Sequence, residues 1–330
     1  MQSKIGFVLG KFMPCHNGHK FLFDTASNLV DKLYILVCTR DCEEINGLLR
    51  ASWVRQLAPK NSVVIHMHKD IPQEPKDDSD FWNIWKQEIN TRIFENITDV
   101  FGSEKYVIKL AAILNAEPCI IDIDRNHIDI SATQIRNNSK HYWDYIPKPV
   151  KSYYQKRVCI VGPQSTGKTT LTHYLANTQN LSFVNEYGRD YDFLYKKGID
   201  WNENDFVKIA KCHLAIQKEV SLCGSHIIIE DTDIIQTIVW AQFLLGFVPI
   251  ELISIFKSIN KADQYLLLTP ETKWINDGTR YKETEQQRQK FYNELQYILE
   301  FFDLKYTVVD SNDYSQRHSK AVSVLDQFLK

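Results

Sequence analysis

The stretch VCIVGPQSTGKTTL, residues 158–171, decides the fold of the second half of the chain. A short apolar run, which we expect to form a buried strand, leads into a glycine-containing loop, and a good helix-forming sequence follows. This is the context of the loops that hold a nucleoside triphosphate by backbone N–H groups at a helix N-terminus. The pattern predicts an ATP and Mg²⁺ site with these members: Gly162, Ser165, Thr166, Gly167, Lys168, Thr169 and Thr170. Lys168 would reach the β- and γ-phosphates, and Thr169 would help to hold the Mg²⁺.

The position of this motif predicts two domains. In such folds the phosphate loop follows the first strand, so the half of the chain before it must fold separately. A length of 330 residues also fits two domains. Prolines 147 and 149 are expected to end the preceding helix, so we place the boundary at Pro149 and predict domains over 1–149 and 150–330.

Composition and charge indicate a soluble globular protein. The net charge of -2 offers no basic excess for nucleic acid. The seven cysteines are scattered without a C-x-x-C pair, which argues against zinc and disulfides and favours a reducing, cytoplasmic setting. Residues 234–250 carry no charge, but Gly246 and Pro249 interrupt them, so we expect a buried helix rather than a membrane span. The sequence allows a homo-oligomer but carries no pattern for one.

A second motif, GKFMPCHNGHK, occupies residues 10–20. It follows an apolar run at 5–9, expected to be a strand, and precedes a helical pattern that begins at Phe21. His16 and His19 therefore lie where a helix N-terminus favours anions. Two imidazoles three residues apart can donate hydrogen bonds to phosphate oxygens, so this loop is a second candidate phosphate site.

The segment ISATQIRNN, residues 130–138, completes that site in the prediction. Ser131 or Thr133 can cap the helix that begins there, and Arg136 can point back to the same phosphates. The two segments together resemble the signatures of the nucleotidyltransferase superfamily. That resemblance implies transfer of a nucleotidyl group from ATP with release of pyrophosphate.

Alternation of strands and helices sets the expected fold class. Between these two motifs we predict strands at 32–39, 62–66, 106–108 and 119–123, and in the second half at 158–161, 226–229, 265–268 and 306–309. Such alternation is typical of doubly wound parallel sheets. We therefore expect an α/β protein with two such domains, a Rossmann-like nucleotidyltransferase followed by a P-loop kinase.

Aromatic and charged residues between the motifs have more than one interpretation. Trp82 and Trp85 lie one helical turn apart, which fits either core packing or a flat wall for a nicotinamide ring. His66 and His68 are interpreted as surface or loop residues rather than metal ligands. An acidic residue at the tip of the strand expected at 226–229 should hold Mg²⁺. Residues 269–289 could fold over ATP as a lid.

The whole chain resembles the NadR-type bifunctional enzymes, in which a nicotinamide mononucleotide (NMN) adenylyltransferase precedes a ribosylnicotinamide kinase. The resemblance rests, in order, on GKFMPCHNGH, FWNIW, FGSEK, IDIDR, ISATQIR, YWDYIP, GPQSTGKTT, NEYGRDY, EDTD and WINDGTR. Several such proteins carry an N-terminal helix-turn-helix repressor domain. This chain begins directly at the first catalytic strand, so we do not expect DNA-binding regulation from it.

The resemblance assigns roles residue by residue. In the first domain His16, His19, Lys11 and Arg136 would stabilise the ATP phosphates, with further ATP contacts from Gly10, Phe12, Gly18, Ser131 and Thr133 and nicotinamide contacts from Trp82, Trp85, Asp122 and Arg125. In the second domain Lys168, Thr169 and Arg280 would bind Mg·ATP, and the riboside would contact Glu186, Tyr187, Arg189, Asp233 and Trp274. Asp231 is the candidate to bind Mg²⁺ and to accept the 5′-hydroxyl proton, although another acid could serve as the base. Nicotinamide riboside would then become NMN and finally NAD.

Other interpretations remain open at this stage. A pantetheine-phosphate adenylyltransferase fused to a dephospho-coenzyme A kinase would share both phosphate motifs, but NEYGRDY, EDTD, FWNIW and WINDGTR favour nicotinamide. A sensor that binds NAD and ATP without turnover would not need both intact phosphate-transfer sites. A chain with one active and one inactive domain is also compatible with the sequence.

Overall fold

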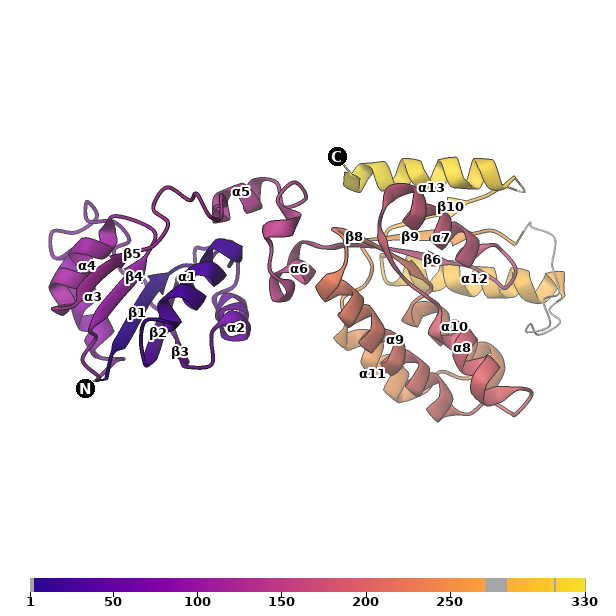
Figure 1. Cartoon of the computed structure of the whole chain (residues 1–330). Helices are drawn as coiled ribbons and strands as arrows, with labels where there is room; N and C mark the ends of the chain where they lie inside the picture. Colours follow the sequence, from indigo (N-terminus) through magenta and orange to yellow (C-terminus); the bar gives the residue numbers. More distant parts are fainter. Residues whose placement is uncertain (1–2, 271–283, 312, 330) are drawn as a thin grey trace. The chain divides into compact units, whose positions relative to one another are not determined.

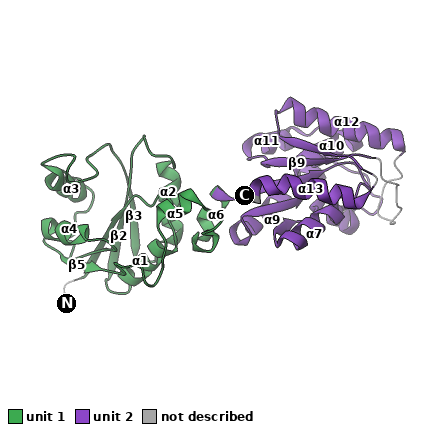
Figure 2. Cartoon of the chain, turned by 90° about the horizontal axis from the view of Figure 1, so that it is seen from above, with its two compact units in different colours: residues 1–153 green, residues 154–330 purple. Residues whose placement is uncertain are grey.

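The computed structural model describes residues 3–270, 284–311 and 313–329, and the chain divides into two compact units (Figure 1). The first unit spans residues 1–153 and the second 154–330 (Figure 2). Each unit contains one five-stranded sheet whose strand pairs are all parallel. The predicted fold class, two doubly wound α/β domains, is confirmed.

The first sheet has the strand order β3-β2-β1-β4-β5. Its strands are β1 (Ile5–Gly10), β2 (Lys32–Thr39), β3 (Ser62–His68), β4 (Asp99–Gly102) and β5 (Glu117–Ile120). Strand β1 is central, and the chain adds strands first on one side of it and then on the other. The loop that follows β1 therefore lies at the point where the strand order reverses, which is where open α/β sheets bind ligands.

Helices cover both faces of this sheet (Figure 1). They are α1 (Asn17–Ser27), α2 (Gly47–Leu57), α3 (Phe81–Asn90), α4 (Tyr106–Leu114), α5 (Ala132–Asn137) and α6 (Lys148–Tyr154), with a short 3-10 turn at Trp143–Tyr145. Phe7 and Val100 from the strands pack against Trp85 and Ile89 of α3 and Leu110 of α4 in one buried cluster. This core fixes the strand ends that carry the first candidate site.

One predicted strand is wrong. Residues 106–108 form the first turn of α4, and the strand lies earlier, at Asp99–Gly102. Tyr106 and its two apolar neighbours looked like a strand because β-branched and aromatic residues favour sheets. The helix prevails because α4 buries Val107 and Leu110 against the sheet, and the Tyr106 hydroxyl donates to the Leu9 carbonyl at 2.9 Å.

The second sheet has the order β10-β9-β6-β8-β7. Its strands are β6 (Lys156–Val161), β7 (Ser182–Val184), β8 (Ile227–Asp231), β9 (Gln264–Leu268) and β10 (Tyr306–Val309). Here β6 is central, so the loop after β6 also lies at a reversal of strand order. Both motifs singled out in the sequence thus follow the central strand of their own sheet.

The helices of the second unit also lie on both faces of its sheet. They are α7 (Lys168–Gln179), α8 (Tyr187–Tyr191), α9 (Glu203–Cys223), α10 (Ile234–Leu245), α11 (Ile250–Ser258), α12 (Glu285–Phe301) and α13 (Tyr314–Leu329), with a π-helical turn at Asp192–Lys196. Helices α7 and α13 share a core with Val158 and Ile160 on one face. Cys159 and Val161 face the opposite core, with α9 to α12.

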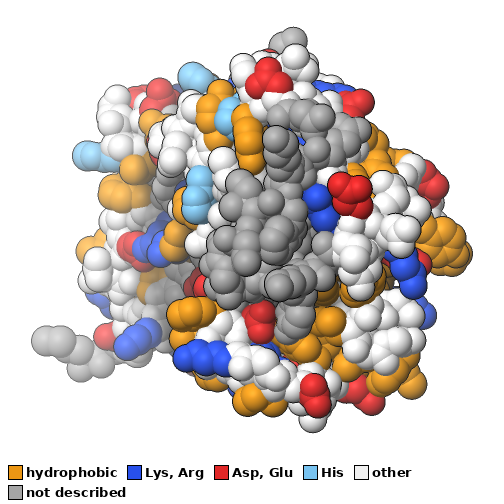
Figure 3. Space-filling model, turned by 90° about the vertical axis from the view of Figure 1, so that its right-hand side faces the viewer, with side chains coloured by type: hydrophobic (Ala, Val, Ile, Leu, Met, Phe, Trp, Pro, Cys, Tyr) orange, Lys and Arg blue, Asp and Glu red, His pale blue; other side chains and the backbone are white. Residues whose placement is uncertain are grey.

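The uncharged stretch 234–250 contains the expected buried helix, α10, which ends before the stretch does; the next helix, α11, begins at Ile250. Helix α10 ends at Leu245, where Gly246 adopts a left-handed conformation with φ 83°, and Pro249 precedes α11. Glycine accepts that conformation without steric cost, which explains the break. Among the described helices, none is long and apolar enough to cross a membrane. On the face shown in Figure 3, charged and hydrophobic side chains are interspersed.

The prolines near the junction begin a helix instead of ending one. Helix α6 starts at Lys148, so Pro149 lies in its first turn, where a missing N–H costs no intrahelical bond. The compact units divide after Tyr153, within the last turn of this helix.

Candidate functional sites

The loop after β1 is shaped by close contacts with Phe12. A Cβ atom on Gly10 would lie 2.8 Å from the Phe12 ring, so only glycine fits there. Phe12 is buried, has φ 47°, and meets His19 edge-on at 4.9 Å between ring centroids. His16 is the N-cap residue of α1, and its backbone N–H donates to His19 Nδ1 at 3.2 Å. The two imidazole rings stack 3.6 Å apart, so the loop presents them as one fixed pair.

A cavity of about 650 Å³ lies against this loop. Its lining includes these residues predicted from the sequence: Gly10, Lys11, Phe12, His16, Gly18, His19, Trp82, Trp85, Asp122, Arg125 and Arg136. Two predicted ATP contacts are not in the lining. Ser131 Oγ accepts the Gln134 N–H and caps α5, and Thr133 Oγ1 accepts from Arg136 at 3.2 Å. Their hydroxyls are used to build α5 and to orient Arg136.

Both histidines are neutral at pH 7 in this arrangement. Burial lowers the pKa of His16 well below its usual value, and the neighbouring His19 and Arg125 lower it further. Burial, with Arg125, lowers the pKa of His19 to about 3. A neutral imidazole can still donate one hydrogen bond to a phosphate oxygen, and an anionic ligand would raise both pKa values.

Two arginines hold the carbonyl groups of the loop. Arg136 of α5 donates to the Met13 carbonyl, which joins the two motifs recognised in the sequence. Arg50 of α2, fully buried, donates to the Lys11 carbonyl at 2.9 Å and to Glu43 at 2.5 Å. Glu43 in turn lies 3.4 Å from Lys11 Nζ. Sequence analysis missed this Arg50–Glu43 pair, although an arginine on the apolar side of α2 was a usable sign of it.

The two tryptophans of α3 fit both predictions made for them, core packing and a flat aromatic wall. Trp85 is 5% exposed, belongs to the core, and its indole N–H donates to the Pro72 carbonyl at 3.0 Å. Trp82 is only partly buried, and both side chains line the cavity. The wall is therefore anchored by core packing while one aromatic surface remains exposed to the cavity.

Asp122 and Arg125, which also line this cavity, stabilise the loop that follows β5. The Asp122 carboxylate accepts backbone N–H groups of His127 and Ile128 at 3.2 and 3.3 Å. Desolvation opposes its ionisation, but these hydrogen bonds lower its pKa overall. Arg125 donates to the Ile130 carbonyl at 3.2 Å and lies 3.8 Å from Glu104. Arg125 is the cation that acts on the histidine pair.

The histidines of β3 lie away from this cavity lining. His66 Nε2 and His68 Nδ1 both hydrogen-bond Thr39 Oγ1, at 2.8 and 3.1 Å, and His68 is exposed. The interpretation of His68 as a surface residue is confirmed, whereas His66 is half-buried within the strand.

In the second unit the loop after β6 forms the predicted cradle. Ser165 and Gly167 have φ 60° and 83°, and the Lys168 ammonium donates to the Gly162 and Pro163 carbonyls at 3.0 and 2.9 Å. The Gly162 N–H donates to Gln236 Oε1 of α10 at 3.1 Å. The loop is therefore closed around its own lysine, which is 5% exposed.

Thr169 and Asp231 form the part of the site that suits a divalent cation. The Thr169 hydroxyl donates to Asp231 Oδ2 at 2.5 Å, and Asp231 Oδ1 is buried without a hydrogen-bond partner among the described residues. Oxygen ligands of this kind fit Mg²⁺. Thr166 instead donates to the Pro163 carbonyl at 2.9 Å, and Thr170 is exposed on α7.

A cavity of about 510 Å³ adjoins the cradle, and Ser165, Lys168, Glu186 and Arg189 are predicted residues in its lining. Burial raises the pKa of Glu186, and neighbouring Asp231 raises it further against the opposing effect of Lys168. Sequence analysis missed several lining residues: Phe193, Trp201, His213, Gln236 and Trp240. Gln236 and Trp240 belong to the stretch 234–250, which was expected only to form a buried helix, and no motif indicated the other three.

Tyr187 and Asp233 are absent from that lining. The Tyr187 hydroxyl interacts with the Cys212 thiol, which raises its pKa. Asp233 caps α10 by accepting the Ile235 N–H at 2.9 Å and also accepts the Tyr265 hydroxyl at 2.8 Å. Asp233 is therefore a buried helix cap outside this lining, and its contact with a riboside stays a prediction. The predicted contacts Trp274 and Arg280 lie outside the described residues.

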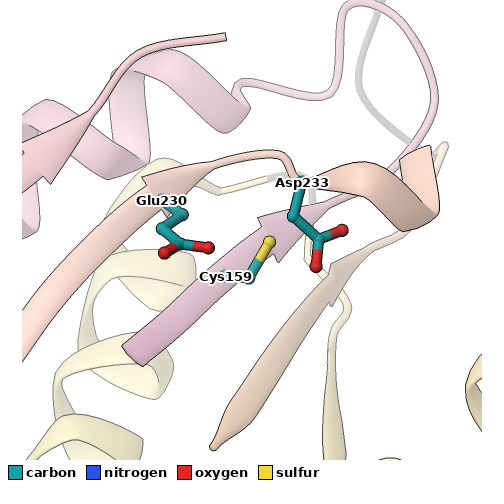
Figure 4. Close-up of side chains that lie close together, drawn as sticks. All are labelled: Cys159, Glu230 and Asp233. Carbon is teal, nitrogen blue, oxygen red and sulfur yellow. The ribbon is translucent and has the colours of Figure 1, made fainter. Parts of the chain in front are cut away.

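Asp233 also belongs to a buried cluster with Cys159 and Glu230 (Figure 4). Both oxygens of Glu230 accept from Arg157, at 2.6 and 2.8 Å. Burial raises the pKa of Asp233 to about 6, and the charge of Glu230 adds to the increase. Because protein donors already occupy these carboxylates, the cluster is a structural hydrogen-bond network rather than a metal centre.

A third arginine supports the second phosphate loop. Arg317 of α13 is 2% exposed and donates to the Thr166 carbonyl at 2.5 Å and to the Thr269 carbonyl at 3.2 Å. It also donates to the Ser311 carbonyl. One side chain thus joins the phosphate loop to the segments that follow β9 and β10. No motif in the sequence indicated it.

These features define a nucleotide-binding protein of two compact units, with one candidate phosphate site after the central strand of each sheet. A protein-family model described as an AAA domain matches residues 157–317. The "Trifunctional NAD biosynthesis/regulator protein NadR" of Escherichia coli (strain K12) is 30% identical over 351 residues, covering 99% of this chain and 84% of that protein. The protein of the same name from Salmonella typhimurium is 29% identical with the same coverage. The chain belongs to the NadR family.

Solved structures of NadR proteins are similar to this structure along nearly the whole chain. One, in complex with NR, has a TM-score of 0.78 and 25% identity, and covers 99% of this chain and 96% of its own. Another, in complex with NAD and AMP-PNP, has a TM-score of 0.74 and 25% identity, with coverage of 98% and 96%. Membership of this family favours the nicotinamide interpretation over the pantetheine one.

Proposed function

We propose that this chain is a bifunctional NAD salvage enzyme. Its second unit, residues 154–330, phosphorylates nicotinamide riboside with ATP to give NMN. Its first unit, residues 1–153, joins NMN to the adenylyl group of ATP to give NAD and pyrophosphate. The observation that carries the proposal is a separate phosphate-binding loop beside a cavity in each unit. Related proteins whose structures contain NR, NAD and AMP-PNP support the choice of ligands.

In the kinase step the 5′-hydroxyl oxygen of the riboside attacks the γ-phosphorus of ATP. The bond from that phosphorus to the β,γ-bridging oxygen breaks, ADP leaves, and the hydroxyl proton passes to a carboxylate. Glu186 suits this role because it lines the cavity, lies near Lys168, and has a raised pKa. Asp231, the acid first considered, already accepts the Thr169 hydroxyl, so it suits the cation instead.

Thr169 and Asp231 would hold Mg²⁺, which would neutralise charge on the phosphates. Lys168 supplies an ammonium group at the same place. This ammonium, which donates to the Gly162 and Pro163 carbonyls, would turn to phosphate oxygens when ATP binds. Positioning and charge neutralisation then account for catalysis.

In the adenylyl step an oxygen of the NMN phosphate attacks the α-phosphorus of ATP and pyrophosphate leaves. No protein nucleophile is needed, because the two substrates supply both reacting groups. His16, His19, Lys11 and Arg136 line one cavity and would reduce repulsion between the two anions. Trp82 and Trp85 on the facing wall suit the nicotinamide ring, with Asp122 and Arg125 holding the loop beside it.

Two separate assays of the purified chain test the proposal. With Mg²⁺, ATP and nicotinamide riboside, we expect one ADP for each riboside consumed. With Mg²⁺, ATP and NMN, we expect one pyrophosphate for each NAD formed. A chain that binds NAD and ATP but gives neither product would be a sensor, and phosphorylation or adenylylation of pantetheine compounds instead would assign it to the rival pathway.

A further inference from the structure

His213 of α9 is a cavity residue that neither the sequence motifs nor the proposed mechanism uses. Its side chain is 6% exposed and lines the cavity of the second unit. Its Nε2 atom is buried and has no hydrogen-bond partner among the described residues. A buried polar atom without a partner is destabilising, so such atoms in a cavity wall point to a ligand that supplies the missing bond.

The surroundings of His213 indicate which part of a ligand it meets. His213 and Glu186 are close enough that each shifts the pKa of the other, and Glu186 is similarly coupled to Lys168 of the phosphate loop. His213 therefore lies within electrostatic range of a carboxylate that also interacts with Lys168. Trp201, Trp240 and other apolar side chains line the same cavity, which suits a flat ring.

A nucleoside placed for phosphorylation has its 5′-hydroxyl beside Lys168 and Glu186. Its ribose must then lie between the phosphate loop and the aromatic wall. Gln164 of the loop also has a buried, unpartnered Oε1 among the described residues and lines the same cavity. The phosphate loop and α9 thus each contribute one buried polar atom without a partner among the described residues. The hydroxyl groups of a sugar could supply the missing hydrogen bonds.

We propose that His213 binds a secondary hydroxyl of the ribose through Nε2 and thereby selects ribonucleosides over their deoxy analogues. The inference rests on the proposed riboside kinase activity and adds a specificity-determining residue to it. A neutral imidazole can accept a hydrogen bond from the hydroxyl or donate one to it, so no charge need be buried. A site built to bond a hydroxyl rejects the analogue that lacks it, because the protein group is then left unpaired.

The test compares His213→Asn with His213→Gln. The asparagine side chain ends near the position of Nδ1 and lacks a group at Nε2, whereas the glutamine amide can reach the Nε2 position. For His213→Asn we expect kcat/KM for nicotinamide riboside to fall about 10- to 100-fold, with KM for ATP unchanged. His213→Gln should recover most of that loss. Lys211→Gln, on the same helix in an exposed ion pair with Glu251, should behave as the wild type.

The 2′-deoxy and 3′-deoxy forms of the riboside make the test specific. The wild type should discriminate strongly against one of them, and His213→Asn should lose that discrimination. Equal losses in both histidine variants with discrimination intact would show a structural role and overturn the inference. If the variants do not fold, equal binding of riboside and both deoxy analogues by the wild type would overturn it. A wild type that phosphorylates no riboside would remove the proposed kinase function and this inference together.

Discussion

The two phosphate loops differ in what carries their positive charge. In the first unit the loop presents His16 and His19, whose pKa values are both lowered, so its charge depends on the ligand and on pH. In the second unit the loop closes around the Lys168 ammonium group. The first arrangement suits the joining of two anions. The second suits transfer of a phosphoryl group to a neutral hydroxyl.

The two loops are alike in how they are supported. Arg50 and Arg136 hold the carbonyls of Lys11 and Met13, and Arg317 holds that of Thr166. Binding the carbonyls from behind fixes the peptide units, which helps to keep the N–H groups available to an anion. In each unit, therefore, an arginine from a helix distant in the sequence holds the phosphate loop in place.

Replacing Lys168 should have the largest effect on activity. For Lys168→Met we expect riboside phosphorylation to fall by a factor on the order of 10³ or more, since a group at the transferring phosphate is lost. NAD formation from added NMN should be unchanged and serves as the control within the same chain. Loss of both activities would contradict the independence of the two loops.

Removing one imidazole should have the next largest effect, in the other unit. For His19→Asn we expect NMN adenylylation to fall about 10²-fold through loss of one phosphate donor, while riboside phosphorylation stays normal. Steady-state kinetics of each half-reaction provide the measurement. A normal rate of adenylylation would remove His19 from the phosphate site.

The same histidine predicts a pH dependence of stability. Its pKa is about 3 in the folded protein and 6.5 when unperturbed, so the unfolded chain binds more protons between these values. Stability therefore rises with pH across this window and is lost as pH falls, by at most about 1.4 kcal/mol per pH unit for this histidine. Thermal unfolding from pH 4 to 8 should show a weaker acid loss in His19→Asn than in the wild type, and equal slopes would contradict this account.

Loosening a supporting arginine should have a smaller and selective effect. For Arg317→Met we expect KM for ATP in the kinase reaction to rise about tenfold, because the Thr166 carbonyl loses its charged donor. Lys320→Met is the matched control on α13, since its ion pair with Asp310 is exposed. The support role would be refuted by a folded Arg317→Met protein whose KM for ATP equals that of the wild type.

The smallest kinetic effect is expected at Asp233. Asn keeps an oxygen to cap α10, so kinetic constants for the riboside should change less than about threefold. The pKa of Asp233 is about 6 in the folded protein and 3.8 when unperturbed, so the wild type loses stability as pH rises through this window. Asp233→Asn should lack this pH-dependent loss of stability. A large increase in KM for the riboside would restore the original assignment of this residue as a ligand.

The sequence predicted the features that depend on local pattern. The strand–loop–helix context of residues 158–171 and the H-x-G-H loop were sufficient to place both phosphate loops, because a tight loop before a helix requires specific residues at fixed spacing. The strand at 106–108 was wrong because Tyr106 and Val107 have sheet propensity that tertiary packing overrides.

Residues that act across the fold could not be predicted in this way. Arg317 reaches a carbonyl 151 positions earlier in the chain, and no local spacing encodes such a contact. His213 belongs to no motif in the sequence, and only the fold brings α9 and this side chain to the cavity of Glu186. The run at 230–233 contains three acidic residues, and only the strand geometry separates Asp231, at Thr169, from Asp233, at Tyr265.

The most direct measurement mixes the two disabled proteins. Lys168→Met and His19→Asn, each incubated alone with nicotinamide riboside, Mg²⁺ and ATP, should form little or no NAD. Mixed in equal amounts, they should form NAD after a lag in which NMN accumulates, because each supplies the site that the other lacks. No NAD from the mixture, with NMN released by the His19→Asn protein, would contradict the claim that the first unit is an adenylyltransferase acting on its own.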